Sequence, residues 1–451
     1  MRIHSARDDD LSAELAKLSA SLDIRKGMTA ADSGELTRAV FGEALSPIES
    51  VRRILGDIAA RGDAAVREYT HNLDGVELSP AQFRVSSEEI AQAWEQTPPE
   101  LRAAMETAAE NIRRFQEAIR PKDAEPVVNP QGGVMALRAL PIRRVACYVP
   151  GGRASYPSSV LMTAVPAQVA GVREVVVTTP CGADGAVRPA TLAAARVAGV
   201  TEIYRLGGAQ AIAALAFGTE TIEKVDKIVG PGNLFVTLAK KEVYGQVDLD
   251  MLAGPSEILI IADAAANPGW LAADLLSQAE HDPAASVLLT PSREVAETTV
   301  RELEKQLPEL SRESAARDCL QRYGFIGVTR DLDEAAELAN QFAPEHLELA
   351  VADPEALLPK CVNAGAVFMG QQTPEPLGDY LAGPSHVLPT GGTARFFSGL
   401  SVHDFLRRTS VLKYTKEALA ASAEAVDVFA RAEGLDAHAR SVTRRVDNSD
   451  S

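Results

Sequence analysis

Short apolar segments alternate with longer segments of helical periodicity over residues 144–369, and no other feature of the sequence restricts the fold as strongly. Segments such as RVACYVP and EVVVTTP have the length and the β-branched content of buried strands, and a helical pattern follows each of them. Strands that alternate with helices in this way form a parallel sheet that is covered on both faces. The alternation therefore predicts an α/β fold.

The alternation runs twice, which predicts two similar Rossmann-like parallel-sheet units with helical N- and C-terminal arms. A length of 451 residues also suggests two or more domains, and the tetrapeptide AGPS occurs at 253–256 and again at 382–385. Before Pro141 the pattern is mainly helical, with Ser46 expected to cap a helix. After about Ser401 we expect no further strand, only a helical tail that packs on something else, such as another subunit.

The charge balance restricts the partners of the chain. The formal net charge is −17 and no strongly basic segment offsets it, so neither nucleic acid nor an anionic membrane is an expected partner. The segment MRIHSARDDDLSAEL lacks the apolar core of a signal peptide, and no apolar run approaches the roughly 18 residues that span a membrane. The four cysteines are scattered without CxxC spacing, as in a cytoplasmic protein with reduced thiols.

Two polar side chains share one face of the helix expected over residues 267–282. Gln278 and His281 are about one helical turn apart, and Gln278 continues an apolar stripe set by Leu271 and Leu275. The pair therefore points toward the interior, where polar groups need partners.

A loop rich in glycine and proline, LGDYLAGPSHVLPTGG, carries Asp379 and His386. Catalytic groups concentrate on loops that a rigid sheet holds in place. Together with Gln278 and His281, these residues offer the oxygen and nitrogen ligands that suit zinc in a site without thiolate. No HExxH helix occurs, and on spacing alone a metal site is a minority interpretation beside structural or surface roles.

Glu345 and His346 are adjacent and directly follow Pro344. A carboxylate beside an imidazole is a natural general acid/base pair near neutral pH. In a regular strand adjacent side chains face opposite sides, so both reach one site only where the backbone is irregular, just after the proline. A surface glutamate beside a half-buried histidine explains the same spacing equally well.

Three glycine turns each follow a predicted strand and precede a predicted helix: GG at 151–152, GGAQ at 207–210 and GPGN at 230–233. A dinucleotide docks at such turns, at the carboxyl ends of parallel strands. None of the three matches GxGxxG, so a role in tight turns alone stays open.

Six longer motifs follow one another along the chain: VDKIVGPGNLFVTLAKKEVYG, DMLAGPSEILIIAD, LLSQAEHD, APEHLEL, GDYLAGPSHVLPTGGTARF and AEGLDAHARSV. In sequence and order they resemble the signatures of the histidinol dehydrogenase family, over residues 46–445. The resemblance implies a zinc- and NAD-dependent, four-electron oxidation of L-histidinol to L-histidine through bound L-histidinaldehyde, the last steps of histidine biosynthesis. It also implies a homodimer with shared active sites and one zinc ion per subunit.

The resemblance assigns roles to individual residues. The zinc ligands that it implies are Gln278, His281, Asp379 and, from the partner subunit of the homodimer, the residue at His438. The acid/base residues are Glu345 and His346. The substrate contacts that it implies are Ser256, Gln278, His281, His346, Asp379, His386, Glu433 and His438. The NAD contacts that it implies are Tyr148, Gln210 and Asn233.

A division into domains follows from the same resemblance. Residues 1–45 form an N-terminal helical arm, residues 46–147 plus 256–400 an α/β domain for zinc and substrate, residues 148–255 an NAD-binding Rossmann-like domain, and residues 401–451 a C-terminal helical arm for dimerisation.

Three other functions remain as alternatives. One is a related dehydrogenase for another small alcohol, such as a diol sulfonate. The second is a zinc hydrolase that uses Glu345 and His346 on water, and the third is a non-catalytic, metal-bridged dimer. Glu433 and His438 favour histidinol over another alcohol, since they suit the amino and imidazole ends of that substrate.

Overall fold

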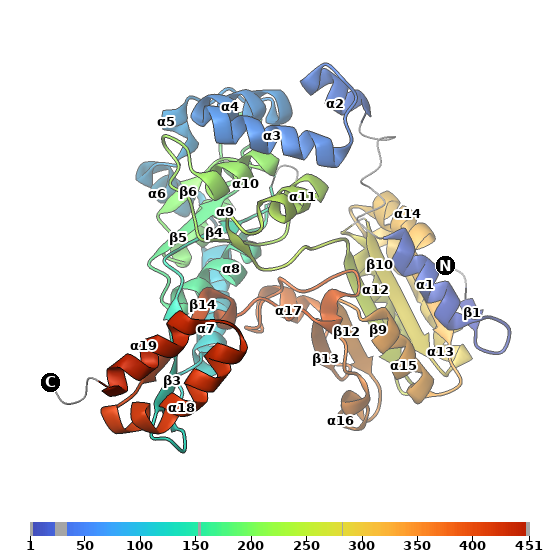
Figure 1. Cartoon of the computed structure of the whole chain (residues 1–451). Coiled ribbons are helices and arrows are strands. Elements are labelled where there is room, and N and C mark those ends of the chain that lie inside the picture. Colours follow the sequence, from blue (N-terminus) through green and yellow to red (C-terminus); the bar gives the residue numbers. More distant parts are fainter. Residues whose placement is uncertain (1–2, 23–33, 152–154, 282, 448–451) are drawn as a thin grey trace.

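Three sheets organise the structure, a computed structural model that describes residues 3–22, 34–151, 155–281 and 283–447 (Figure 1). Two sheets are parallel, with six and five strands, and the third is a small antiparallel sheet of three strands. The two parallel sheets confirm the predicted α/β fold with two such units. Gly152 of the first glycine turn and Asp282 at the expected end of the Gln278 helix lie outside the described residues.

The six-stranded sheet has the order β1-β11-β10-β9-β12-β13, and all its pairings are parallel. Its strands are β1 (Ile3–Ser5), β9 (Ser256–Ala262), β10 (Ala284–Thr290), β11 (Gly324–Val328), β12 (His346–Ala350) and β13 (Ala366–Met369). Alternate residues of β9 face opposite sides, so Ile258 and Ile260 belong to one core and Leu259 and Ile261 to another. Both faces of the sheet are therefore covered.

Helices from several parts of the chain cover these two faces. They are α1 (Leu11–Ser21) and α15 (Leu332–Phe342) on one side, and α12 (Pro268–Ala279), α13 (Arg293–Gln306) and α14 (Glu313–Tyr323) on the other. The predicted N-terminal arm does contain helices, α1 and also α2 (Gly34–Phe41), but it adds a strand that was not predicted. In that strand Ile3 pairs with Ile326 at the edge of the sheet. A three-residue strand is too short to show an alternating pattern.

The five-stranded sheet has the order β6-β5-β4-β7-β8. Its strands are β4 (Arg144–Tyr148), β5 (Glu174–Thr178), β6 (Glu202–Tyr204), β7 (Lys227–Val229) and β8 (Asp248–Leu249). Its connecting helices are α8 (Pro157–Ala170), α9 (Pro189–Val197), α10 (Gly208–Phe217) and α11 (Leu234–Val243). The chain moves outward from β4 in one direction to β6 and then returns to the other side at β7. Such a reversal of strand order is where open α/β sheets bind nucleotides.

The helices between residues 47 and 119 pack against the helices that cover this five-stranded sheet. They are α3 (Pro47–Arg61), α4 (Asp63–Tyr69), α5 (Pro80–Phe83), α6 (Ser87–Gln96) and α7 (Pro99–Ile119). Their buried side chains, such as Ile54 and Ile112, share one core with those of β4 to α11. This packing differs from the predicted division, which grouped residues 46–147 with 256–400. Helical periodicity shows which face of a helix is buried but not which sheet covers it. The domain boundaries themselves stay a prediction.

The predicted start of α3 is confirmed in detail. The Ser46 hydroxyl accepts a hydrogen bond from the N–H of Glu49, and the Glu49 carboxylate accepts one from the N–H of Ser46. This reciprocal capping box satisfies two donors that a helix end would otherwise leave without partners.

The C-terminal part contains a strand where only helices were predicted. Strand β14 (Leu406–Lys413) pairs antiparallel with β3 (Val134–Pro141), which also pairs with β2 (Val127–Val128). Neither face of β14 is buried, so its sequence lacks the alternation that reveals a strand. Helices α18 (Lys416–Ala432) and α19 (Asp436–Asp447) follow and pack on each other. In Figure 1 this C-terminal arm stands well away from α12 and the six-stranded sheet.

Within the described residues no helix combines the length and apolar character that a membrane span requires. The connection after β13 contains the short helix α17 (Pro376–Tyr380), which lies between the two parallel sheets (Figure 1).

Candidate active site

Helix α15 ends in an irregular turn that positions two functional side chains. Ala343 has a φ of 53°, the only positive φ of a non-glycine residue in the described chain, and Pro344 follows it. Glu345 and His346 come next, where β12 begins. The backbone irregularity expected at this point is present, and both side chains reach the same neighbour, Glu257 of β9.

Glu257 contacts both side chains through its main chain. Its N–H donates a hydrogen bond to Oε2 of Glu345 (3.0 Å), and its carbonyl oxygen lies 3.0 Å from Nδ1 of His346. Nδ1 of His346 lies 3.8 Å from Oε2 of Glu345. Glu345 is 6% exposed and His346 is 4% exposed. The alternative of a surface glutamate beside a half-buried histidine is therefore wrong.

Burial changes the ionisation of this pair. Loss of solvent raises the pKa of Glu345 well above its ordinary value, and the carboxylates of Glu257 and Asp379 act in the same direction. Loss of solvent lowers the pKa of His346 to about 4, although Asp379 opposes the change. The imidazole is therefore neutral at physiological pH. Because Nδ1 faces a carbonyl oxygen, which can only accept, Nε2 carries the free lone pair.

The loop residues predicted to bind metal or substrate lie beside the pair. One oxygen each of Glu375 and Asp379 and one ring nitrogen of His346 lie within 4.8 Å of one another. Nδ1 of His386 is 3.8 Å from an oxygen of Asp379, and its Nε2 is 3.2 Å from the hydroxyl of Ser159 at the start of α8. The site therefore lies where the two parallel sheets approach each other.

Helix α12 supplies Gln278 and, just beyond its end, His281. The N–H of His281 donates to the carbonyl of Gln278 (3.1 Å), so the chain continues for another turn, and Gln278 is only 2% exposed. Burial lowers the pKa of both His346 and His386, and repulsion from His281 adds to both shifts. The three imidazoles thus lie in one neighbourhood. The predicted substrate residue Ser256 is also close, since its hydroxyl acts to lower the pKa of Glu345.

Three carboxylates near the site were missed in the sequence, two of them buried (Glu348 and Glu375) and one half-buried (Asp274). Burial raises the pKa of Asp274 to about 6 and those of Glu348 and Glu375 to about 9. The strongest charge effects on Glu348 and Glu375 come from other carboxylates, so this region would be stabilised by a cation. Spacing could have found two of them. Glu348 lies on the same strand face as His346, and Asp274 lies one helical turn before Gln278.

Two of the predicted site residues lie far from the others. Glu433 and His438 are both exposed, on the C-terminal arm that stands away from α12 (Figure 1). They line a shallow apolar cavity of about 310 Å³ with Ala425, Val426, Phe429, Ala430 and Leu435. Within one chain, the structure therefore does not bring His438 to Gln278, His281 and Asp379.

The predicted NAD contacts lie at the carboxyl edge of the five-stranded sheet. Gln210 and Asn233 line one cavity of about 370 Å³, above the turns that precede α10 and α11. Tyr148 is 3% exposed, and its hydroxyl accepts a hydrogen bond from the N–H of Gly208 (3.1 Å). Gly230 has a φ of 109°, and a Cβ there would lie 2.1 Å from the carbonyl oxygen of Tyr148, so only glycine fits this turn.

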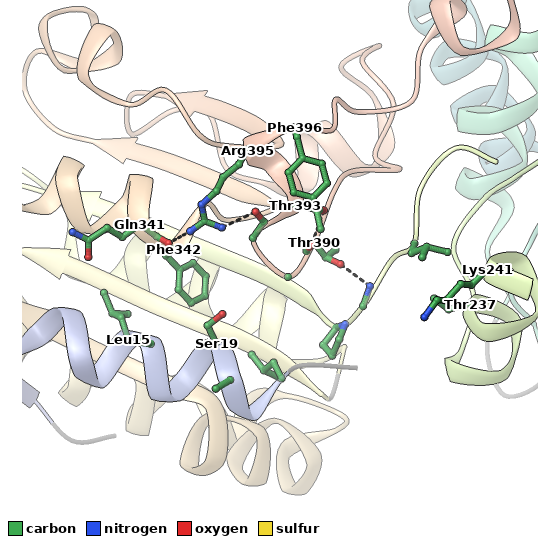
Figure 2. A pocket seen from close by; sticks show the side chains of 18 of the residues that line it. Leu15, Ser19, Thr237, Lys241, Gln341, Phe342, Thr390, Thr393, Arg395 and Phe396 are labelled. Carbon is green, nitrogen blue, oxygen red and sulfur yellow. Dashed lines mark hydrogen bonds between the residues drawn. The ribbon is translucent and has the colours of Figure 1, made fainter. Parts of the chain in front are cut away.

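A larger cavity, of about 700 Å³, lies between α1, α11 and the loop that runs from Thr390 to Phe396 (Figure 2). None of the predicted site residues is among the described residues that line it. The loop nevertheless forms hydrogen bonds with Gly254 and Glu257, at and just before the start of β9. The hydroxyl of Thr390 accepts from the N–H of Gly254 (2.6 Å), and the N–H of Gly391 donates to Oε1 of Glu257 (3.2 Å).

The site contains a buried carboxyl–imidazole pair beside further imidazoles and carboxylates. It lies next to a parallel sheet whose strand order reverses as in nucleotide-binding folds. Together these features indicate an α/β oxidoreductase. The histidinol dehydrogenase family model matches residues 42–446. The chain belongs to the histidinol dehydrogenase family.

Relatives and one solved structure agree with this assignment. The histidinol dehydrogenase of Heliobacterium mobile is 53% identical over 399 residues, which cover 88% of this chain and 93% of that protein. The histidinol dehydrogenase of Aquifex aeolicus is 50% identical over 400 residues, covering 88% and 92%. The crystal structure of histidinol dehydrogenase from Elizabethkingia anophelis superposes with a TM-score of 0.86 at 38% identity, covering 92% of this chain and 96% of that one. These matches confirm the family that the six motifs predicted.

Proposed function

We propose that the protein oxidises L-histidinol to L-histidine in two successive steps through bound L-histidinaldehyde, with two molecules of NAD, as the last steps of histidine biosynthesis. The observation that carries the proposal is the buried Glu345–His346 pair on the main chain of Glu257, in a chain that matches the family over residues 42–446. The four cysteines are all buried and none of them forms a disulfide, which fits a cytoplasmic enzyme.

His346 has the properties of the base for the first step. It is neutral, and the carbonyl of Glu257 leaves the lone pair on Nε2. That nitrogen takes the proton of the substrate hydroxyl while the carbon loses a hydride. Bound NAD supplies the hydride acceptor in both steps.

Glu345 has the properties of the base for the second step. Its pKa is raised by burial, and a carboxylate with a raised pKa is a stronger base once it is ionised. It removes a proton from the water that adds to the aldehyde carbon. The resulting hydrate loses a second hydride and a further proton, which gives the carboxylic acid.

We propose that one zinc ion per subunit is held by Gln278, His281, Asp379 and His438 of the partner subunit. The donor set fits in its chemistry, since imidazole, amide and carboxylate atoms are ligands for zinc, and Asp379 lies within 4.8 Å of donor atoms of His346 and Glu375. Zinc would provide a Lewis-acidic anchor for the imidazole and amine of histidinol. The chain's own residues Ser256 and His386 would contact the substrate, with Glu433 from the partner's C-terminal arm.

A homodimer with shared sites is supported by the exposed apolar face of that arm. Val426 is 38% exposed, Phe429 72% and Leu435 41%, beside Glu433 and His438. Apolar clusters of this kind mark surfaces that another chain covers. A second copy that covers the arm would carry Glu433 and His438 to the site that lacks them.

A stoichiometric assay tests the proposal. Two NADH should form for each L-histidinol consumed, activity should be lost on chelation, and zinc should restore it. One NADH per substrate with release of free aldehyde would contradict the four-electron reaction. A preference for an alcohol without imidazole in a substrate panel would contradict histidinol as the substrate, and turnover without NAD would indicate a hydrolase.

A further inference from the structure

One carboxylate faces the cavity above the Gly208 and Asn233 turns, and no step of the proposed reaction uses it. Asp74 is the only charged residue among the described residues that line this cavity of about 370 Å³. It ends the helical turn of residues Thr70–Asp74, in the part of the chain that packs against the helices covering the five-stranded sheet. The rest of the wall is mainly apolar and includes Val40, Phe41, Pro47, Ile54, Leu234 and Phe235.

Asp74 presents hydrogen-bond acceptors to this space, and Gln210 lies behind it. Nε2 of Gln210 donates to Oδ2 of Asp74 (2.9 Å). Gln210 is fully buried, and its Oε1 has no hydrogen-bond partner among the described residues. A buried acceptor without a donor is costly, and it indicates a group that a ligand completes.

The backbone at Gly208 permits this arrangement. Gly208 has a φ of 63°, and a Cβ at this position would lie 2.5 Å from Oε1 of Gln210. Any larger residue would therefore displace the amide from the wall of the cavity. The glycine keeps the Gln210 side chain folded back against its own turn and next to Asp74.

The strand that follows β4 lacks the carboxylate that usually meets the ribose in this kind of fold. In dinucleotide-binding units an acidic residue about 20 residues beyond the first glycine turn bonds to the ribose hydroxyls. Here β5 ends at Thr178, and Thr179, Pro180 and Cys181 follow it. A carboxylate from outside the unit, Asp74, lies instead at the cavity between the turns that begin α10 and α11. Helix N-termini of that kind suit a pyrophosphate.

We infer that Asp74 binds the hydroxyls of the adenosine ribose of NAD, with the adenine on the apolar wall, and that it thereby excludes NADP. The inference rests on NAD as the cofactor of the proposed function. A vicinal diol offers two O–H donors, which match the acceptor oxygens of the Asp74 carboxylate. A 2′-phosphate would instead bring a second negative charge into the same desolvated space. No lysine or arginine is among the described residues that line the cavity, and the nearby Arg53, stacked on Phe41, is paired with Glu43.

A purely structural role for Asp74 explains less. Holding Nε2 of Gln210 accounts for one hydrogen bond but leaves Oε1 without a donor. It also leaves a carboxylate on the wall of an apolar cavity, where desolvation raises its pKa to about 6. A ribose diol gives this carboxylate the donors that the apolar wall lacks.

Calorimetric titration of the intact protein with 5′-AMP and with 2′,5′-ADP measures binding at this subsite without turnover. The parent should bind 5′-AMP much more tightly than 2′,5′-ADP. Asp74→Ala should weaken 5′-AMP by about tenfold or more, as expected for loss of a hydrogen bond to a charged group. Asp74→Asn, which is nearly isosteric and can still accept from Gln210, should remove most of the discrimination against 2′,5′-ADP. In steady-state assays kcat/KM for NAD should fall in these variants, and the preference for NAD over NADP should shrink.

Glu77→Gln is the matched control, because Glu77 is an exposed carboxylate near Asp74 that pairs with Arg67 and does not line the cavity. Equal binding of both nucleotides by the parent, or 5′-AMP affinity within about twofold of the parent in both Asp74 variants, would overturn the inference. Melting temperatures show whether Asp74→Ala is folded. If it is unfolded, the nucleotide affinities of Asp74→Asn test the inference. Failure of the parent to form NADH from histidinol would contradict the proposed function separately, since AMP binding does not depend on the substrate.

Discussion

The main-chain carbonyl oxygen of Glu257 lies 3.0 Å from Nδ1 of the His346 ring. A carbonyl has no proton to give, so this contact fixes the proton of the neutral imidazole on Nδ1. It leaves the nitrogen that faces Glu375, 3.6 Å away, as the basic one. The pairing of the adjacent strands β9 and β12 places this carbonyl beside the ring, so it determines the tautomer of His346.

The first prediction concerns His346→Asn. Asparagine can keep a hydrogen bond to the Glu257 carbonyl but offers no basic nitrogen, so substrate should still bind while kcat falls about 100- to 10,000-fold. Calorimetry with L-histidinol and steady-state NADH formation measure the two effects. His403→Asn, at an exposed position, is the control and should behave like the parent. An unchanged kcat in His346→Asn would remove this residue as the base.

The second prediction separates the two oxidation steps through Glu345→Gln. If Glu345 serves the addition of water to the aldehyde, the variant should still oxidise the alcohol but should stop at the aldehyde. The first turnover should then give one NADH per site instead of two, followed by slow release of aldehyde. Stopped-flow absorbance with aldehyde trapping measures this outcome. Equal loss of both NADH molecules would place Glu345 in the first step as well.

The third prediction concerns pH and Glu257. Burial raises the pKa of this carboxyl from 4.5 to about 8, and one of its oxygens has no hydrogen-bond partner among the described residues. Because the folded pKa lies above the unfolded one, the folded state holds an extra proton between these values. The free energy of unfolding therefore falls as pH rises through that window, by about 1.4 kcal/mol for each unit of pKa difference. Above about pH 8 the loss is complete.

Glu257→Gln should remove this dependence while keeping the main-chain contacts to Glu345 and His346. Denaturation curves from pH 5 to pH 8.5 should show the variant gaining stability relative to the parent as pH rises. Glu77→Gln should show no such gain, because Arg67 lowers the pKa of Glu77 and places its titration in the acid range. Parallel curves for Glu257→Gln and the parent would contradict a protonated Glu257.

The fourth prediction tests whether a site combines two chains. A His346→Asn protein and a His438→Asn protein should each be inactive. After unfolding and refolding as a mixture, hybrid dimers should contain one intact site and one doubly defective site. An equal mixture should therefore regain about a quarter of the parent activity, because about half of the dimers are hybrid. A mixture that stays inactive, although size and cross-linking show hybrids, would place all ligands in one chain.

The fold was largely predictable because buried strands and helices leave recognisable patterns of apolar residues in the sequence. The strands of both parallel sheets are apolar on both faces, and the helices between them show one apolar side. β1 and β14 escaped prediction for different reasons: the first is three residues long, and the second has no buried face. The packing of α3 on the five-stranded unit was also missed, since helical periodicity does not show which part of the protein covers the apolar face of a helix.

The site was predictable where the chemistry is local and through the family motifs. The irregular backbone before Glu345 followed from the adjacent proline, and the buried Gln278 followed from helical spacing, whereas His281 lies beyond the end of α12 and is exposed. The contact between Glu257 and His346 joins residues that are 89 positions apart and goes through the main chain, which has no sequence signature. Asp74 was missed for a similar reason, because its partner Gln210 lies 136 positions away.

The edge strand β1 has a consequence for the order in which the protein folds during synthesis. Ile3 pairs with Ile326, and Ser12 of α1 bonds to Gln341, which is 329 positions further along the chain. The helices α3 to α7 and the five-stranded sheet have all left the ribosome before β11 is made. β1 and α1 therefore leave the ribosome long before the strand and the helix that they contact are made. During that interval they stay in solution without their partners in the sheet.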